Sequence, residues 1–274
     1  MFFNDIKRLQ KEAAKEDPNA IWELAWHHTW GQKLPQDPQK SFELHHKLAD
    51  QNIPGACYLV GEYYRLGYGT AKDPQKAIPY YENAAEKNNE HAIYRLHMLD
   101  QPENDRLFAP YENDPVLVTA AVYSIALCNG DGILIHYPKA LKIMVLAAEA
   151  GDPIAQYIYG DMACRGAGAN RSFIRAFIWT KKAAEANYPP AISTLAHYYF
   201  NGTGTLTNLQ LAYEWLLKAE PYGDSDALFD LGVIYYHGYG APQDKTKGIE
   251  YLKTAARAGH DRAIKSLKEL KQPY

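Results

Sequence analysis

Two pairs of adjacent histidines, His27–His28 and His45–His46, have side chains suited to metal binding. Adjacent residues on a helix point about 100° apart, so neither pair can chelate an ion alone. His28 and His45 could meet between paired helices, but no third ligand is obvious. We therefore expect no metal site and interpret these histidines as packed or solvated side chains.

Three cysteines, Cys57, Cys128 and Cys164, could support thiol chemistry. An odd number without paired spacing is not typical of a disulfide framework. Cys128 and Cys164 occupy equivalent positions in successive copies of a repeat described below. A redox pair would need Cα atoms within about 7 Å, whereas packed helices lie about 10 Å apart. We expect reduced thiols, and we find no nucleophile–base–acid set, so we expect no enzyme.

Paired glycines such as Gly67 and Gly69 could suggest a phosphate-binding loop. Such loops lie between a strand and a helix and need a third glycine or a Lys-Ser/Thr pair, which these lack. The pairs instead recur once per repeat. We interpret them as structural turns and expect no cofactor.

These residues lie in a repeat of 36 residues, whose clearest copies begin near Ala155, Ala191 and Ala227. The same register predicts a single solenoid over 1–274, with a half-copy at 1–17 and a capping helix at 261–274. Copies are expected to start near 18, 54, 90, 117, 153, 189 and 225. The copy near 90 is degenerate, because its Gly-x-Gly is missing and only 27 residues separate Ala92 from Thr119.

Each copy encodes two helices. In the second full copy, apolar or small residues from Ala56 to Tyr64 follow one helical face. Gly67 then ends the helix, because glycine accepts the left-handed conformation of a C-cap. Asp73-Pro74 starts the second helix, with an N-cap and a favoured first residue. One copy cannot bury both faces alone, so the copies must stack.

This pattern resembles the Sel-1-like repeat family, and the closest stretch is Leu231-Gly232-Val233-Ile234-Tyr235-Tyr236-His237-Gly238-Tyr239-Gly240. The resemblance implies an all-α, right-handed superhelix of antiparallel helix pairs that binds another protein. Family members include adaptors, regulators and envelope- or secretion-linked interaction proteins. It also suggests an immunity or regulatory protein that sequesters a cognate toxin or effector.

A cysteine-rich branch of the family supplies the alternative, a peptidoglycan- or β-lactam-related hydrolase. That branch carries a cysteine pair bridging the two helices of each copy. This chain lacks those pairs, which argues against the alternative.

The family analogy places partner-binding residues on the concave face of the first helices, at fixed positions around the packing glycine. Aromatic residues and arginine are enriched at the centres of protein interfaces. The alternative is that these rings pack on the next first helix. The predicted contact residues are Trp22, Trp26, Trp30, Tyr58, Glu62, Arg65, Tyr94, Tyr157, Asp161, Arg165, His197, Phe200, Phe229, Tyr236 and His237.

Charge and hydropathy restrict the class of partner. The net charge is −3, whereas nucleic-acid binders usually present a strongly basic face. No apolar run reaches 18 residues, so we expect no membrane insertion. Charged residues arrive too early in the chain for a signal peptide. We expect a cytoplasmic protein whose partner is another protein.

Overall fold

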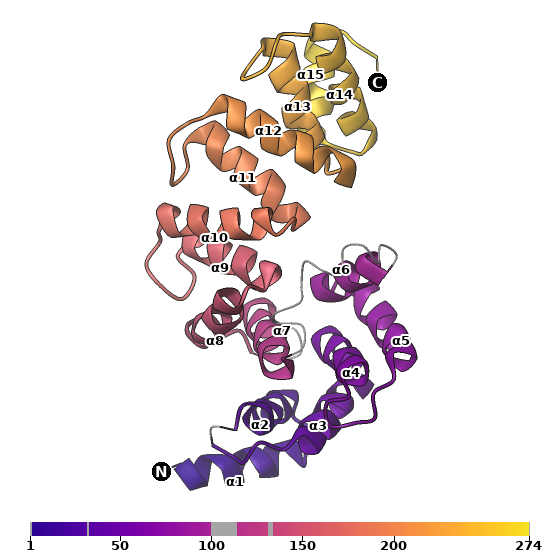
Figure 1. The fold of residues 1–274 in the computed structure, drawn as a ribbon, viewed down its shortest axis with the longest axis vertical. Coiled ribbons are helices and arrows are strands. Elements are labelled where there is room, and N and C mark those ends of the chain that lie inside the picture. The colour runs from indigo at the N-terminus through magenta and orange to yellow at the C-terminus, as the bar shows by residue number, and fades with distance from the viewer. Residues whose placement is uncertain (1, 32, 100–113, 131–133, 274) are drawn as a thin grey trace. The chain divides into compact units, whose positions relative to one another are not determined.

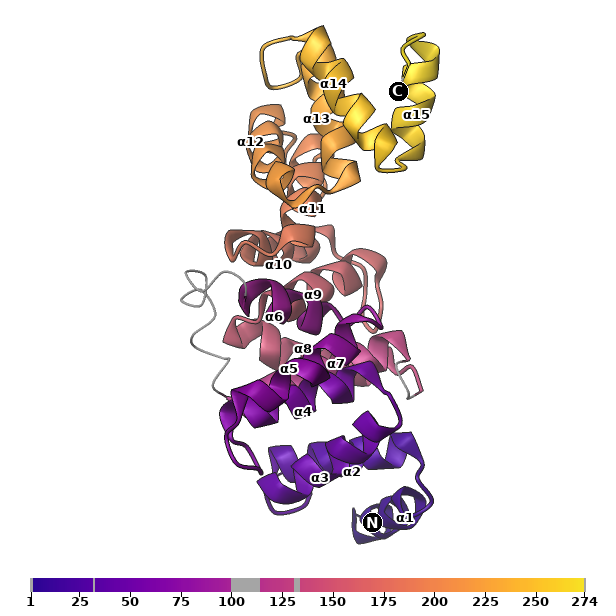
Figure 2. The same cartoon turned by 90° about the vertical axis from the view of Figure 1, so that its right-hand side faces the viewer.

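The computed structural model describes residues 2–31, 33–99, 114–130 and 134–273. Their regular elements are all helical, and consecutive helices lie side by side in pairs (Figures 1 and 2). Two compact units are present: Met1–Tyr159 with Ala167–Ala169, and Gly160–Gly166 with Asn170–Tyr274. Whether these form the expected single solenoid stays a prediction, as does the right-handed sense.

The first unit contains the helices from α1 to α8 and the start of α9. Their bounds are α1 Phe2–Ala13, α2 Pro18–Trp30, α3 Pro38–Asp50, α4 Pro54–Leu66, α5 Pro74–Ala85, α6 Glu90–Leu99, α7 Pro115–Asn129, α8 Tyr137–Ala150 and α9 Pro153–Arg165. The second unit contains the rest of α9 and α10 Phe173–Glu185, α11 Pro189–Asn201, α12 Leu209–Ala219, the short 3₁₀ helix η2 Glu220–Tyr222, α13 Ser225–His237, α14 Lys245–Arg257 and α15 Asp261–Glu269.

Start and stop signals in the sequence define these helices as expected. Asp73 accepts a hydrogen bond from the backbone N–H of Lys76 and is followed by Pro74 at the first helical position. Asp37 caps α3 in the same way. Gly67 and Gly238 end α4 and α13 in the left-handed region, with φ of 77° at both.

Where the structure describes it, the second glycine of a Gly-x-Gly pair packs against the preceding copy, as at Gly69, Gly168, Gly204 and Gly240. A Cβ at Gly69 would lie 2.0 Å from the carbonyl oxygen of Pro38 at the start of α3. A Cβ at Gly240 would lie 2.1 Å from the carbonyl oxygen of Leu209 at the start of α12. A side chain at either position would clash with the backbone of the preceding copy. Close packing of successive copies therefore explains the repeated glycine, without any role in phosphate binding.

Glycines within the helices lie where first and second helices approach closely. A Cβ at Gly61 would lie 2.5 Å from a ring carbon of Tyr81. A Cβ at Gly232 would lie 2.8 Å from Leu252, and α14 contributes its own glycine, Gly248, at the same crossing. These close approaches hold each helix pair together.

One helix departs from simple stacking of neighbours. Helix α7 packs on its own partner α8 and also on α2 and α4, which precede it by two copies or more (Figure 1). Every residue from Val118 to Cys128 is buried. Helix α7 therefore packs in the interior of the first unit, between α2, α4 and α8.

Candidate functional site

The face of α2 that carries the tryptophan stripe is covered by α7. The ring of Trp22 stacks on that of Tyr123, with centroids 5.4 Å apart and an interplanar angle of 13°. Trp26 lies 5.6 Å from the same tyrosine ring and 5.0 Å from Trp30. Trp22 and Trp26 are 0% and 5% exposed. Trp22, Trp26 and Trp30 follow one another at every fourth residue of α2, but Trp22 and Trp26 face α7 of the same chain.

Polar contacts at one edge fix α7 on this face. The hydroxyl of Tyr123 donates to Oε2 of Glu23 at 2.7 Å, and Lys139 of α8 pairs with the same carboxylate. Burial alone would raise the pKa of Glu23, but hydrogen bonds from His27, Lys139 and Tyr123 and the charge of Lys139 lower it well below its usual range. Glu23 is thus an ionised anchor between α2, α7 and α8.

Buried hydroxyls make a second set of contacts. Thr29 donates to a backbone carbonyl of its own helix and therefore accepts from Ser41 of α3, with 2.6 Å between the oxygens. Thr119 donates to the carbonyl of Pro115 and therefore accepts from Tyr63 of α4 at 2.8 Å. The second bond joins α4 to α7 and specifies the register between these two helices.

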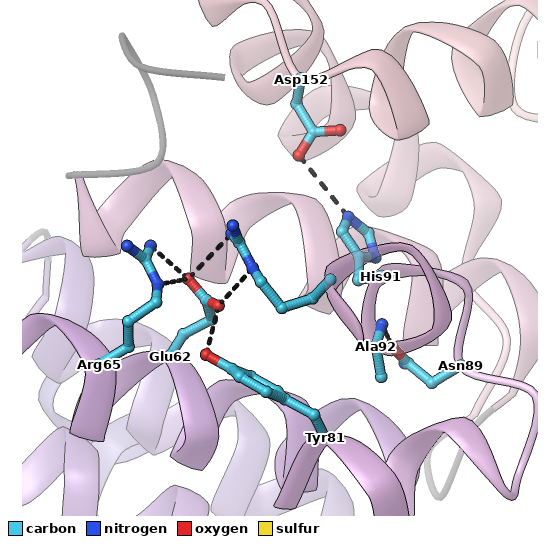
Figure 3. A network of polar contacts seen from close by, with 8 residues as sticks. Glu62, Arg65, Tyr81, Asn89, His91, Ala92 and Asp152 are labelled. Atoms are coloured by element: carbon cyan, nitrogen blue, oxygen red, sulfur yellow. Dashed lines mark hydrogen bonds and ion pairs between the residues drawn. The ribbon is translucent and has the colours of Figure 1, made fainter. Parts of the chain in front are cut away.

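Glu62, which the family analogy places on the open face, is the centre of a buried ion network (Figure 3). Its carboxylate is 2.6 Å from Nη2 of Arg65 and 3.1 Å from Nε of Arg95, and it accepts the hydroxyl of Tyr81 at 2.7 Å. Burial alone would raise the pKa of Glu62, but the two arginines outweigh burial and lower it. The network joins α4 to α5 and α6.

Helix α6 is also held by a buried histidine. Nε2 of His91 lies 3.6 Å from Oδ2 of Asp152 (Figure 3). The other oxygen of Asp152 accepts the backbone N–H of Ala155 at 2.7 Å, which caps the start of α9. The Asp152 carboxylate therefore contacts α6 and also caps the start of α9.

In the second unit, side chains of the first helices remain accessible. Phe200 of α11 lies 6.3 Å from Tyr239, which stacks on His237 with centroids 5.1 Å apart, and His237 contacts Tyr236 at 5.1 Å. Lys245 lies over the Tyr236 ring. We call Phe200, Tyr236, His237 and Tyr239 the aromatic cluster. Tyr239 is 41% exposed, His237 is exposed, and the other two are half-buried.

Charged residues accompany the cluster. Nδ1 of His197, three residues before Phe200, lies 3.8 Å from Oδ2 of Asp230 on α13. A hydrogen bond with Asp230 raises the pKa of His197 above its ordinary value. On α9, the first helix of the preceding repeat, Arg165 pairs with Asp161. The second unit thus presents rings for desolvation and ionic groups for orientation.

The structure places the predicted contact residues in three environments. We predicted that all of these residues lie on an open face. That prediction is wrong for five residues that are buried: Trp22, Trp26, Tyr58, Glu62 and Phe229. Trp30, Arg65, Tyr157, Asp161, Phe200 and Tyr236 are half-buried, and Arg165, His197 and His237 are exposed. The side chain of Tyr94 lies outside the described residues. Whether the accessible ones contact a partner stays a prediction.

Each burial has a specific cause. Helix α7 covers Trp22 and Trp26, as described above. Tyr58 packs against the rings of Tyr81 and His91, because α5 and α6 close over α4. Phe229 stacks on His260 at 4.6 Å between centroids, and α15 thereby caps the array.

Among the histidine candidates, His45 is a buried packing group, whereas His46 is partly exposed and contacts Asp50. His45 has its Nδ1 2.9 Å from the carbonyl of Ser41, and its ring lies edge-on to those of Trp22 and Tyr63. Cys57, Cys128 and Cys164 form no disulfide bond in the structure. Among the described residues, no three His, Cys, Asp or Glu side chains are placed to share a metal ion. None of the described helices combines the length and apolar character needed to cross a bilayer.

Sequence reasoning missed Tyr123, Glu23 and Arg95, which make the decisive contacts of the first unit. One signal was available. The stretch Val118–Cys128 lacks any charged residue, and such a helix is buried on all sides and not on one stripe. That signal shows that α7 is covered, but not by which helices.

Paired helices repeating along the chain define the protein as an all-α solenoid-type repeat protein. The Sel1 repeat model matches residues 18–53, 54–89, 119–152, 153–188, 189–220 and 225–260. These six repeats span most of the sequence, so the chain belongs to the Sel1 repeat family. The degenerate copy near 90 and the half-copy at 1–17 lie outside the matches and stay predictions.

Solved structures share this fold. A Sel1 repeat protein from Oxalobacter formigenes matches with a TM-score of 0.52 and 26% identity, covering 97% of this chain and 79% of that one. A protective antigen of uropathogenic Escherichia coli matches with a TM-score of 0.52 and 24% identity over 94% of this chain. This chain spans 50% of that antigen's length. An immunity protein from Pseudomonas aeruginosa is more distant, with a TM-score of 0.35 and 18% identity over 88% of this chain and 83% of that one. No curated protein matches the sequence.

Proposed function

We propose that this protein is a non-enzymatic scaffold that binds another protein on the first-helix face of its second unit. The observation that carries the proposal is the contrast between the two units. The first-helix face of the first unit is filled by α7, whereas the aromatic cluster of the second unit is accessible.

The chemistry of that face suits a protein partner. Accessible aromatic side chains supply apolar area that a partner can desolvate, and they lose little side-chain entropy on binding. The His197–Asp230 pair joins α11 and α13, which carry the cluster, and the Arg165–Asp161 pair lies on the preceding first helix, α9; both supply charges that fix orientation. Such a combination is typical of an interface centre with a polar surround.

The specific role we propose is that of an immunity or regulatory protein that sequesters one cognate toxin or effector in the cytoplasm. A rigid repeat face suits this role, because little ordering is needed on binding. The family resemblance supports the role, and the partner itself must come from experiment.

The test begins with a pull-down and mass spectrometry, followed by measurement of Kd for the captured partner. Tyr239→Ala is the main variant, and Tyr222→Ala is its matched control, since both tyrosines are surface-exposed, at 41% and 44%. Loss of a binding hot spot weakens affinity by about thirtyfold or more. We expect that loss for Tyr239→Ala alone, with both variants melting like the wild type. Equal affinity for the two variants would refute this face as the contact.

A further inference from the structure

The outer face of α10 is apolar at repeat positions where other second helices carry polar side chains. Ile174 and Ile178, one turn apart, are 65% and 47% exposed. The equivalent positions of α12 hold Gln210 and Glu214, whose side chains hydrogen-bond at 3.3 Å. Helix α10 (Figure 1) therefore replaces a polar surface pair with two exposed isoleucines.

The same polar pair occurs in α3, where Gln39 and Glu43 lie 3.5 Å apart. Around the isoleucines of α10, the apolar surface continues onto Phe173, which is 43% exposed. The turn between α11 and α12 adds Leu206, which is 87% exposed. That turn lies against the start of α10, because a Cβ at Gly204 would be 2.1 Å from the Phe173 carbonyl oxygen. We call Phe173, Ile174, Ile178 and Leu206 the α10 patch.

Basic side chains surround the α10 patch. The guanidinium of Arg171 lies over the Phe173 ring, 5.0 Å from its centroid, and Lys182 lies over Trp179 of the same helix at 4.0 Å. Arg175 is exposed between them. Residues 170–185 contain four basic residues and one acidic residue, Glu185, in a chain whose net charge is −3. The patch therefore carries local positive charge opposite in sign to the whole protein.

We propose that the α10 patch docks the protein peripherally on an anionic lipid surface. The patch protrudes on a helix and a turn, so its side chains can enter the interfacial region of a bilayer. Aromatic and aliphatic side chains combined with Lys and Arg are the composition of interfacial binding helices. Each basic residue near an anionic leaflet strengthens binding by several-fold. A second copy is a poorer occupant, because like charges would face each other around both patches.

Vesicle co-sedimentation tests the proposal with the full chain. The probes are vesicles of phosphatidylcholine alone and vesicles of equal parts phosphatidylcholine and phosphatidylglycerol. We expect binding only to the mixed vesicles, and a decrease as salt screens the basic residues. Failure to bind the mixed vesicles overturns the proposal.

Two variants separate the apolar and ionic contributions. Ile174→Gln/Ile178→Gln replaces both isoleucines with exposed neutral polar side chains and leaves the charge unchanged, so folding should be preserved, and vesicle affinity should fall about tenfold or more. Arg175→Gln/Lys182→Gln keeps the apolar side chains and should weaken binding by a similar factor. Lys40→Gln/Lys47→Gln removes charge at the equivalent positions of α3 and should bind like the wild type.

Equal vesicle binding by all three variants would overturn the proposal, since the adsorption would then not depend on α10. Self-association abolished by Ile174→Gln/Ile178→Gln, with no vesicle binding, would equally overturn it and identify a homotypic contact. The result is independent of the proposed partner face, because Tyr239 lies outside the substituted positions.

Discussion

Trp22 of α2 and Tyr123 of α7 stack almost in parallel, although α4, α5 and α6 lie between their repeats in the sequence. The hydroxyl of Tyr123 is simultaneously held by Glu23 at 2.7 Å. The first unit thus binds one of its own helices on the face of α2 where the sequence predicted contact with a partner. Stability of that unit should depend on this contact.

Replacing Tyr123 tests the arrangement. Tyr123→Ala removes a buried ring, 2% exposed, and should lower the free energy of unfolding by about 3–5 kcal/mol in urea denaturation. Tyr123→Phe keeps the ring and loses the bond to Glu23, so a smaller loss of about 1–3 kcal/mol is expected. The exposed Tyr222→Ala serves as control. If Tyr123→Ala were no more destabilising than Tyr222→Ala, α7 would not occupy this face.

Local signals predicted the helices and their ends. The cap of Asp73, the left-handed Gly67 and the tight crossing at Gly61 follow from residue chemistry and repeat spacing. The sequence could not predict which helix packs on Trp26, because an apolar stripe shows that a surface is covered without identifying the element that covers it. The shortened copy near 90 breaks the register, and the position of α7 then depends on long-range contacts such as Tyr63 to Thr119.

The Glu62 network gives a second prediction. Glu62→Gln leaves the guanidinium groups of Arg65 and Arg95 without their shared carboxylate and should destabilise the protein by about 3–5 kcal/mol. Asp161 occupies the same repeat position and also pairs with an arginine one turn on, but its side chain is 42% exposed. Asp161→Asn should therefore cost less than about 1 kcal/mol. Equal losses in chemical denaturation would contradict the burial of Glu62.

The close helix crossing at Gly160 gives a third prediction. A Cβ there would lie 2.9 Å from Oγ1 of Thr180 and 3.2 Å from the carbonyl oxygen of Ala176. Gly160→Leu should overpack the crossing and lower the free energy of unfolding by about 1–3 kcal/mol or more. Hydrogen exchange should show the loss of protection concentrated in α9, α10 and their neighbours. The exposed Ala258→Leu should melt like the wild type, and an unchanged melt for Gly160→Leu would disprove the assigned register.

His45 gives the last prediction, a pH dependence of stability. Burial disfavours the charged ring and lowers the pKa of His45 from 6.5 to about 4, with only partial compensation from the carbonyl of Ser41. Above pH 6.5 the ring is neutral in both states and contributes no pH dependence. As the pH falls from 6.5 towards 4, the unfolded chain binds a proton that the folded chain does not, so the folded state loses stability. Each pKa unit corresponds to about 1.4 kcal/mol, and the full loss approaches about 3 kcal/mol near pH 4.

The measurement is urea unfolding at about pH 7 and about pH 5, a range above the ordinary pKa of Glu23 and Glu62. His45 should account for a loss of about 2 kcal/mol over that interval. His197 acts with the opposite sign, because its pKa is raised and its contribution is present at low pH and lost as the pH rises. His45→Gln should remove the loss, and His46→Gln, one residue along on a more exposed side of α3, should retain it. If the His45→Gln variant kept the full pH dependence, the neutral buried imidazole would not be its source.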